Sequence, residues 1–379
     1  MKNLINQIFE IVKGYREGED GEMSIDIITN WIRQFDEEDQ EFLLSELLHI
    51  LKLRYASKDN FKEYFKGILF KDIAKMAQSN FGLTDLKDIF GKLYFIDQQP
   101  KDKSQKNILN ILGDVLREEF DLDISNCGKD NVIAVIYLDD ILCTGDTLFK
   151  GLSDWLQKAD FAADKNNKEF MEEKKLNVIS IFYAVHNLNM YKVRSRFNRE
   201  HKNIQLGFIW EDNHGIDNDY RKPQNSALQF IYPKYKAEEK LIEDCRAQIE
   251  EKVDGYCDEK RYSRTENYFY RDKNYPSKES MFTSNANRDR FEEIILKKSI
   301  ELYNLADSKK VRMRPLGNGL TTDKSFGFGT LFFTWRNVPY NTPMVFWYEH
   351  KGWQPLFKRN YTEYGSASGW DDFFKELFG

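Results

Sequence analysis

Two continuous apolar runs, separated by a helical stripe, most strongly limit how this chain can fold. Residues 132–138 (VIAVIYL) and 178–185 (VISIFYAV) are apolar at nearly every position rather than at every second one. A strand that is apolar on both faces is buried on both sides, as in a parallel sheet covered by helices. Between the two runs, Leu148, Leu152 and Trp155 have the spacing of one helix face. This order predicts an α/β fold with a doubly wound parallel sheet.

Two shorter apolar runs extend the expected sheet. They are LYFI at 93–96 and GFIW at 207–210. A second helical stripe, formed by Ile108, Leu112 and Val115, lies between the first of these runs and residue 132. The pattern therefore predicts four strands with helical crossovers.

The chain is expected to divide into three consecutive regions. Residues 1–85 are predicted to be helical, residues 86–235 to form the sheet core, and residues 236–379 to be helical and then strand-rich, completing the fold. The acidic run DEED at 36–39 has two interpretations, a metal site or the start of a helix. Acidic residues are common at helix N-termini because the helix dipole favours them there, so we prefer the helix start, with Asp36 as the N-cap.

Composition excludes several classes of protein. The formal net charge is -6, whereas a dedicated nucleic-acid-binding protein usually carries a basic excess. The four cysteines form no CxxC pair, which predicts a reduced, cytoplasmic protein without a zinc ribbon. No stretch reaches the ~18 apolar residues of a membrane span, and the N-terminus lacks the apolar region of a signal peptide.

The densest basic run has two interpretations. It consists of Lys309, Lys310, Arg312 and Arg314. These side chains are able to contact the phosphates of a nucleic acid. Alternatively, they protect the edge of a strand from pairing with other chains, which the acidic net charge favours.

Residues 135–147 (VIYLDDILCTGDT) carry the clearest functional signal. A buried strand leads into Asp139 and Asp140, and a loop with Thr144, Gly145 and Thr147 then enters a helix. Ligands of open α/β sheets bind at the carboxyl ends of the strands. Backbone amides and hydroxyls at a helix N-terminus bind anions, whereas paired carboxylates suit the hydroxyls of a sugar. Together these features predict a site for a sugar 5-phosphate.

This run resembles the phosphoribosyl diphosphate motif of type I phosphoribosyltransferases. The motif has four apolar residues, two acids, three further residues and then Thr-Gly-x-Thr, and every spacing matches. The resemblance implies a phosphoribosyltransferase-like parallel sheet flanked by helices. It implies that Asp139 and Asp140 are catalytic, bind the ribose 2- and 3-hydroxyls and take part in binding Mg²⁺ with the diphosphate. The loop that would hold the 5-phosphate comprises Thr144, Gly145, Asp146 and Thr147.

The same resemblance implies further site residues. The loop at 97–104 (DQQPKDKS) lies where that fold has its pyrophosphate loop, so Lys103 and Ser104 would contact the diphosphate. The alternative is a surface lysine beside a helix cap. His186 ends the strand at 178–185 and would act as an acid or base if it faced the same crevice, whereas the alternative is a structural histidine. Glu211 and His214 follow the next strand in the same way.

Two residues depart from the motif. Asp146 fills a loop position that is often glycine, and its carboxylate has to point away from a bound phosphate. Cys143 stands where some purine transferases carry an acidic general base, and a thiol replaces a carboxylate poorly in that role.

Both ends of the chain resemble PRTase-CE, a phosphoribosyltransferase-like family of bacterial conflict systems. The lead-in is residues 28–51, and the tail carries Gly-Phe-Gly at 327–329, a Pro-Asn turn at 337–343 and a Trp-x-Pro-Leu-Phe-x-Arg signature at 353–359. The family is associated with anti-phage defence, including retrons, where it accompanies a reverse transcriptase and its RNA–DNA hybrid. The resemblance implies either an effector enzyme that acts at ribose C1 or a non-catalytic nucleotide sensor or scaffold subunit.

Overall fold

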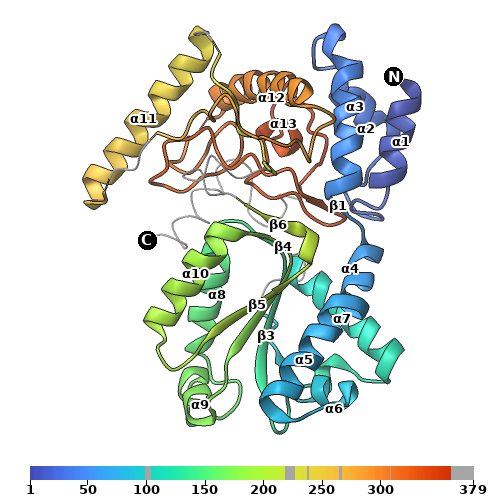
Figure 1. The fold of residues 1–379 in the computed structure, drawn as a ribbon, viewed down its shortest axis with the longest axis vertical. Coiled ribbons are helices and arrows are strands. Elements are labelled where there is room, and N and C mark those ends of the chain that lie inside the picture. Colours follow the sequence, from blue (N-terminus) through green and yellow to red (C-terminus); the bar gives the residue numbers. More distant parts are fainter. Residues whose placement is uncertain (99–103, 218–226, 237–238, 264–266, 308, 360–379) are drawn as a thin grey trace. The chain divides into compact units, whose positions relative to one another are not determined.

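The chain forms two units in its computed structural model (Figure 1). One unit comprises Met1–Tyr55, Ile231–Lys273 and Glu279–Gly379, and the other comprises Ala56–Phe230 and Asn274–Lys278. This division differs from the three consecutive regions expected from the sequence, because residues 56–85 belong to the unit that contains the sheet. The structure describes residues 1–98, 104–217, 227–236, 239–263, 267–307 and 309–359.

The second unit contains the parallel sheet that the apolar runs predict. Its strands are β2 (Leu93–Phe95), β3 (Ala134–Leu142), β4 (Val178–His186), β5 (Leu206–Trp210) and β6 (Gly215–Ile216). The order is β2-β3-β4-β5, and every pair is parallel. β6 continues the β5 edge, because it also pairs with β4, beginning at Val185 opposite Gly215. The α/β fold class is confirmed.

Helices cover both faces of this sheet (Figure 1). Val135 and Tyr137 of β3 pack in one core with α8, α9 and α10. On the other face, the ring of Tyr183 in β4 lies 4.5 Å from that of Phe61 in α4. The helical segments of the unit are α4 (Lys58–Tyr64), the π-helix η1 (Phe65–Leu69), α5 (Phe70–Phe81), α6 (Leu86–Gly91), α7 (Ser104–Phe120), η2 (Ile124–Asn126), α8 (Asp146–Leu156), α9 (Asn167–Lys174), α10 (Asn187–Glu200) and η3 (Asp212–His214).

The first unit is mainly helical. Its elements are α1 (Lys2–Val12), α2 (Ile25–Ile32), α3 (Glu37–Arg54), α11 (Lys240–Lys260), α12 (Asn285–Leu305), β7 (Phe333–Thr334) and α13 (Met344–Trp347), and β1 (Tyr55–Ala56) lies where the chain leaves it. α3 begins directly after Asp36, as predicted, with three acidic residues in its first turn. None of the helices in the described ranges is long and apolar enough to cross a membrane.

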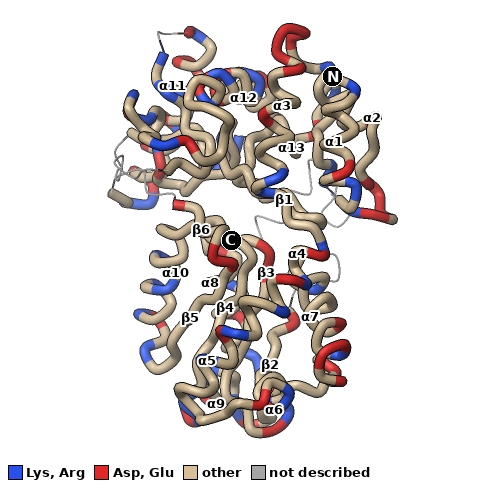
Figure 2. The backbone as a smooth tube through the Cα atoms, turned by 45° about the vertical axis from the view of Figure 1, so that its right-hand side comes forward, with Lys and Arg blue, Asp and Glu red and all other residues tan. Residues whose placement is uncertain are grey.

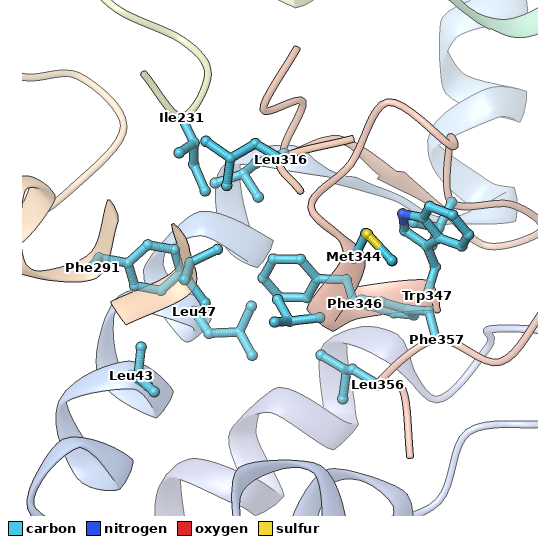
Figure 3. Close-up of a cluster of buried hydrophobic side chains, with 14 of the residues drawn as sticks. Leu43, Leu47, Ile231, Phe291, Leu316, Met344, Phe346, Trp347, Leu356 and Phe357 are labelled. Atoms are coloured by element: carbon cyan, nitrogen blue, oxygen red, sulfur yellow. The ribbon is translucent and has the colours of Figure 1, made fainter. Parts of the chain in front are cut away.

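A single apolar core joins segments of the first unit that are far apart in the sequence. Leu43 and Leu47 of α3 lie near Phe291 of α12 and Phe346 of α13 (Figure 3). All four side chains are fully buried. The tail is therefore part of this core, and burial of apolar surface is what holds it there.

The tail contains fewer strands than the sequence suggested. Within the described residues after Leu305, regular structure consists of β7 and α13, and the rest is turns and irregular backbone. Glycines explain this packing: a Cβ on Gly327 would lie 2.1 Å from the Gly317 oxygen, and a Cβ on Gly329 would lie 2.1 Å from the Ile231 oxygen. Backbones that approach this closely leave no room for the side chains of an ordinary strand.

Charged residues of both signs are interspersed along the helices of each unit (Figure 2). In the first unit some of them are buried as pairs. Arg288 of α12 is fully buried, and its guanidinium donates to Glu279 at 2.5 and 2.9 Å and to Glu292 at 3.0 Å. Arg271 lies 3.2 Å from the other oxygen of Glu292. Removing one partner of such a network leaves a buried charge without compensation.

We predict that Arg288→Met destabilises the first unit by about 3–5 kcal/mol, because Glu279 and Glu292 lose their main cation. Arg290→Met is the matched control on the same helix. Its side chain is half exposed and pairs with Asp39, so its loss costs less than about 1 kcal/mol. Urea unfolding followed by circular dichroism measures both, and equal shifts of the two variants would contradict the prediction.

Candidate phosphoribosyl site

The acid pair lies inside β3 rather than after it. β3 continues to Leu142, and Asp139 is in register with Phe182 of β4. The pairing extends past the apolar run because β4 is itself long and apolar up to Val185. Successive strand residues face opposite sides of a sheet, so the two carboxylates diverge. Asp139 is partly exposed, whereas Asp140 is buried.

Donors among the described residues hold the Asp139 carboxylate. The Ser104 hydroxyl donates to Oδ1 at 2.6 Å, the Asp140 amide donates to the same oxygen at 2.9 Å, and the Tyr137 hydroxyl donates to Oδ2 at 3.3 Å. Ser104 is the first residue of α7, so the start of that helix lies against the acid pair. The structure thus brings together the end of the upstream loop and the predicted sugar-binding acids. Lys103, the other residue expected to contact diphosphate, lies outside the described residues.

The predicted phosphate loop connects β3 to α8, as expected. Gly145 precedes the first helical residue, Asp146, and has a φ of 82°. A Cβ on Gly145 would lie 2.9 Å from the Cβ of Val193 in α10. Backbone conformation and lack of space therefore both require glycine at this position.

Polar contacts set the shape of the loop. The Thr144 hydroxyl oxygen accepts from the Asp146 amide at 3.3 Å, and the Cys143 carbonyl accepts from the Asn189 side chain at 2.7 Å. Thr147, in the first turn of α8, is exposed. The N-terminus of this 11-residue helix carries a partial positive charge, which favours an anion at the loop. The carboxylate of Asp146 occupies the same turn and opposes a second negative charge there.

Cys143 is a neutral thiol in this setting. Burial raises its pKa well above the usual value, and the nearby carboxylates of Asp140 and Asp139 raise it further. A thiol with a raised pKa is a poor base at neutral pH. The arrangement therefore supplies no replacement for an acidic base at this position.

His186 lies at the carboxyl end of β4, as predicted, but its side chain is fully buried. Burial lowers its pKa to about 3, so the ring is neutral at neutral pH. A neutral, enclosed imidazole favours the structural interpretation over that of an acid. After β5, Glu211 lies 3.5 Å from His214, whose ring stacks on that of Tyr183 at 5.1 Å.

Within the described ranges, no three histidine, cysteine, aspartate or glutamate side chains gather as a complete metal site. Mg²⁺ at diphosphate sites usually needs one or two carboxylates, the other ligands being water and phosphate oxygens. Asp139 and Asp140 meet that requirement in chemical type. The Asp140 Oδ1 atom also accepts from the Ile141 amide at 2.8 Å.

Sequence reasoning missed three residues that shape the site: Tyr137, Asn189 and Val193. Tyr137 is two positions before Asp139 on one face of a strand, so the alternation of strand residues was a usable signal. Asn189 and Val193 lie on α10 and reach the loop only through the folding of the chain. No local pattern marks them.

Comparison with models of protein families matches residues 28–359 to PRTase-CE. The chain belongs to the PRTase-CE family. The match spans most of the chain, including the acid pair and the loop of the PRTase-CE protein described above, and it supports a phosphoribosyltransferase-like function. No curated protein and no solved structure matches this chain.

We predict that Gly145→Ala destabilises the protein by about 1–2 kcal/mol, because alanine disfavours a positive φ, with a further cost from the contact with Val193. Gly151→Ala, in the middle of α8, is the control. Its Cβ meets nothing closer than 4.0 Å, and alanine stabilises a helix interior by about 0.5–1 kcal/mol. Thermal unfolding measures both, and opposite signs are expected. Stabilisation by both would show that the loop is not constrained as described.

Proposed function

We propose that residues 139–147 bind the ribose 5-phosphate part of phosphoribosyl diphosphate or of a nucleotide. The observation that carries the proposal is the contact between Ser104 and Asp139, 2.6 Å long, beside a glycine-bearing loop at a helix N-terminus. This contact supports the proposal, because Ser104 would then contact the diphosphate, Asp139 the sugar and the loop the 5-phosphate at one end of β3. Membership of the PRTase-CE family supports the same class of ligand.

The proposed chemistry takes place at ribose C1. A nucleophile, either an acceptor or water, uses its lone pair to form the new bond to C1 and loses a proton. The C1–O bond to diphosphate, or the bond from C1 to a base, breaks, and the leaving group takes the electron pair. Asp139 would hold the ribose hydroxyls through its carboxylate, and the amides at the start of α8 would hold the 5-phosphate. When bound, Mg²⁺ would neutralise charge on the diphosphate oxygens and so make diphosphate a better leaving group.

We further propose that the protein is an effector of an anti-phage defence system, in a retron with a reverse transcriptase and its RNA–DNA hybrid. This proposal rests on the resemblance of the lead-in and the tail to proteins of such systems. A second candidate is a non-catalytic nucleotide sensor or scaffold subunit of the same assembly. The raised pKa of Cys143 favours this second candidate, because no base replaces the missing carboxylate there.

Calorimetric titration with phosphoribosyl diphosphate and Mg²⁺ tests the binding site. We expect Asp139→Asn/Asp140→Asn to weaken binding by roughly 100-fold, because two charge-assisted contacts of about 1.5 kcal/mol or more each are lost. Asp130→Asn/Asp154→Asn is the control with the same change in charge, since both of its side chains are exposed. No binding by the native chain, or equal loss in both double variants, would overturn the proposal.

Co-purification with a reverse transcriptase separates the two candidate functions. If Asp139→Asn/Asp140→Asn abolishes transfer or cleavage at ribose C1 but the protein still co-purifies with the reverse transcriptase, the site is catalytic. If the variant loses the assembly as well, the acid pair has a scaffold role and the enzyme interpretation is wrong.

A further inference from the structure

Three cations converge on one tyrosine in the first unit. Lys252 belongs to α11, Tyr303 to the last turns of α12, and Lys309 and Arg314 follow that helix. Lys309 and Arg314 come from the basic run that the sequence marked as a possible nucleic-acid contact. In the structure Lys309 lies over the ring of Tyr303, and the charge of Arg314 acts on both Lys252 and Tyr303.

Short distances link Lys252, Lys309 and Tyr303, and Arg314 lies close enough for its charge to act on Lys252 and Tyr303; these four residues are called the cation cluster. The Lys252 Nζ atom donates to the Tyr303 hydroxyl at 3.2 Å and to the Lys309 carbonyl at 2.9 Å. The Lys309 Nζ atom lies 4.9 Å from the centre of the Tyr303 ring. Arg314 is fully buried, and its terminal nitrogens donate to the carbonyls of Val311, Met313 and Asp323.

In the part of the chain that the structure describes, none of these three cations forms an ion pair. The charge of Asp323 acts on Arg314 without a salt bridge between the two side chains. Neighbouring cations behave differently: Lys324 lies 2.7 Å from Asp254, and Lys297 lies 2.7 Å from Glu239. The cation cluster is therefore unlike the mixed charges that surround it.

Burial and the neighbouring cations both act on the pKa of Lys252. Partial burial, together with the charges of Lys309 and Arg314, lowers the pKa of Lys252 to about 8. Burial likewise lowers the pKa of Arg314 to about 10. The other titratable groups facing the cluster, Cys245 and Tyr303, both have a pKa of about 12 and are neutral at pH 8. Among the described residues, the charge of Asp323 acts on Arg314, but no carboxylate forms an ion pair with Lys252, Lys309 or Arg314.

We propose that Lys252, Lys309 and Arg314 bind a small oxyanion of the phosphate class, at a site separate from residues 139–147. Two ammonium groups and a guanidinium supply donors that match a tetrahedral oxyanion. The Nε atom of Arg314 is buried and has no hydrogen-bond partner in the described residues, so one donor is already available inside the protein. Because Arg314 is enclosed, a compact anion fits the cluster better than a nucleic-acid backbone lying across the surface.

Anion binding at this site has a distinctive consequence. A negative charge beside Lys252 raises its pKa toward the ordinary value, so the protein takes up a proton when the anion binds. At pH 8.5 the side chain of Lys252, with a pKa of about 8 in the free protein, is largely deprotonated, which predicts that anion binding is accompanied by measurable uptake of protons. Sulfate is a suitable probe because it does not itself titrate near this pH.

Calorimetric titration of the full chain with sulfate at pH 8.5, in two buffers of different ionisation enthalpy, tests the proposal. We expect saturable binding with proton uptake. We expect Lys252→Gln/Lys309→Gln to weaken it by about tenfold or more, since each lost charged donor accounts for about 1.5 kcal/mol. Lys240→Gln/Lys351→Gln, which removes two exposed lysines of the same unit, is the matched control and should bind as the native chain does.

A second variant, Thr144→Val/Thr147→Val, distinguishes this site from the phosphate loop. It should keep the proton-linked binding of sulfate. Loss of binding in this variant with retention in Lys252→Gln/Lys309→Gln would place sulfate at the loop and overturn the proposal. So would the absence of binding by the native chain, in which case the cations serve only to hold backbone carbonyls. Thermal unfolding without sulfate checks that Lys252→Gln/Lys309→Gln remains folded.

Discussion

Parallel pairing of β3 with β4 is the constraint on which the candidate site depends. The pairing continues past the last residue of the apolar run, so Asp139 and Asp140 lie on a strand held by its neighbour rather than on a free loop. A strand held in this way sends one carboxylate to each face of the sheet. It also fixes the point at which the chain leaves the sheet, and with it the start of α8. The helices then complete the site, since Ser104 of α7 and Asn189 of α10 both contact it.

The first unit contains buried cations, and they differ in whether carboxylates pair with them. Arg271 and Arg288 are buried, and carboxylates compensate them. The cation cluster around Tyr303 has no such compensation, although Arg314 is buried just as completely. Buried charge is costly unless it is paired, so a cluster of cations without ion pairs, in the same unit as a paired network, points to a ligand that supplies the missing charge.

Much of the fold was predictable because a continuous apolar run fits few kinds of structure, chiefly a strand that is buried on both faces. Residues 132–138 and 178–185 predicted β3 and β4 to within a few residues at each end, and Asp36 marked the start of α3. The segment 158–175 was less predictable. It is rich in charged residues, yet it contains α9, whose Met171 is fully buried. The end of the chain was expected to be strand-rich, but its large apolar residues at 344–347 form the helical turn of α13, which begins after Pro343.

The sequence by itself determined the class of fold, the order of the strands along the chain and the acid–loop–helix motif, because hydrophobic pattern and spacing are local properties. It also carried the family resemblance. Only the tertiary structure decided that Ser104 binds Asp139, that Val193 leaves no room for a side chain at residue 145, and that His186 is enclosed and neutral. Each of these results depends on side chains that are distant in sequence and meet only when the chain packs. The cation cluster arose in the same way, since Lys252 is more than fifty residues from Lys309, and only the packing of α11 against the end of α12 brings their charges together.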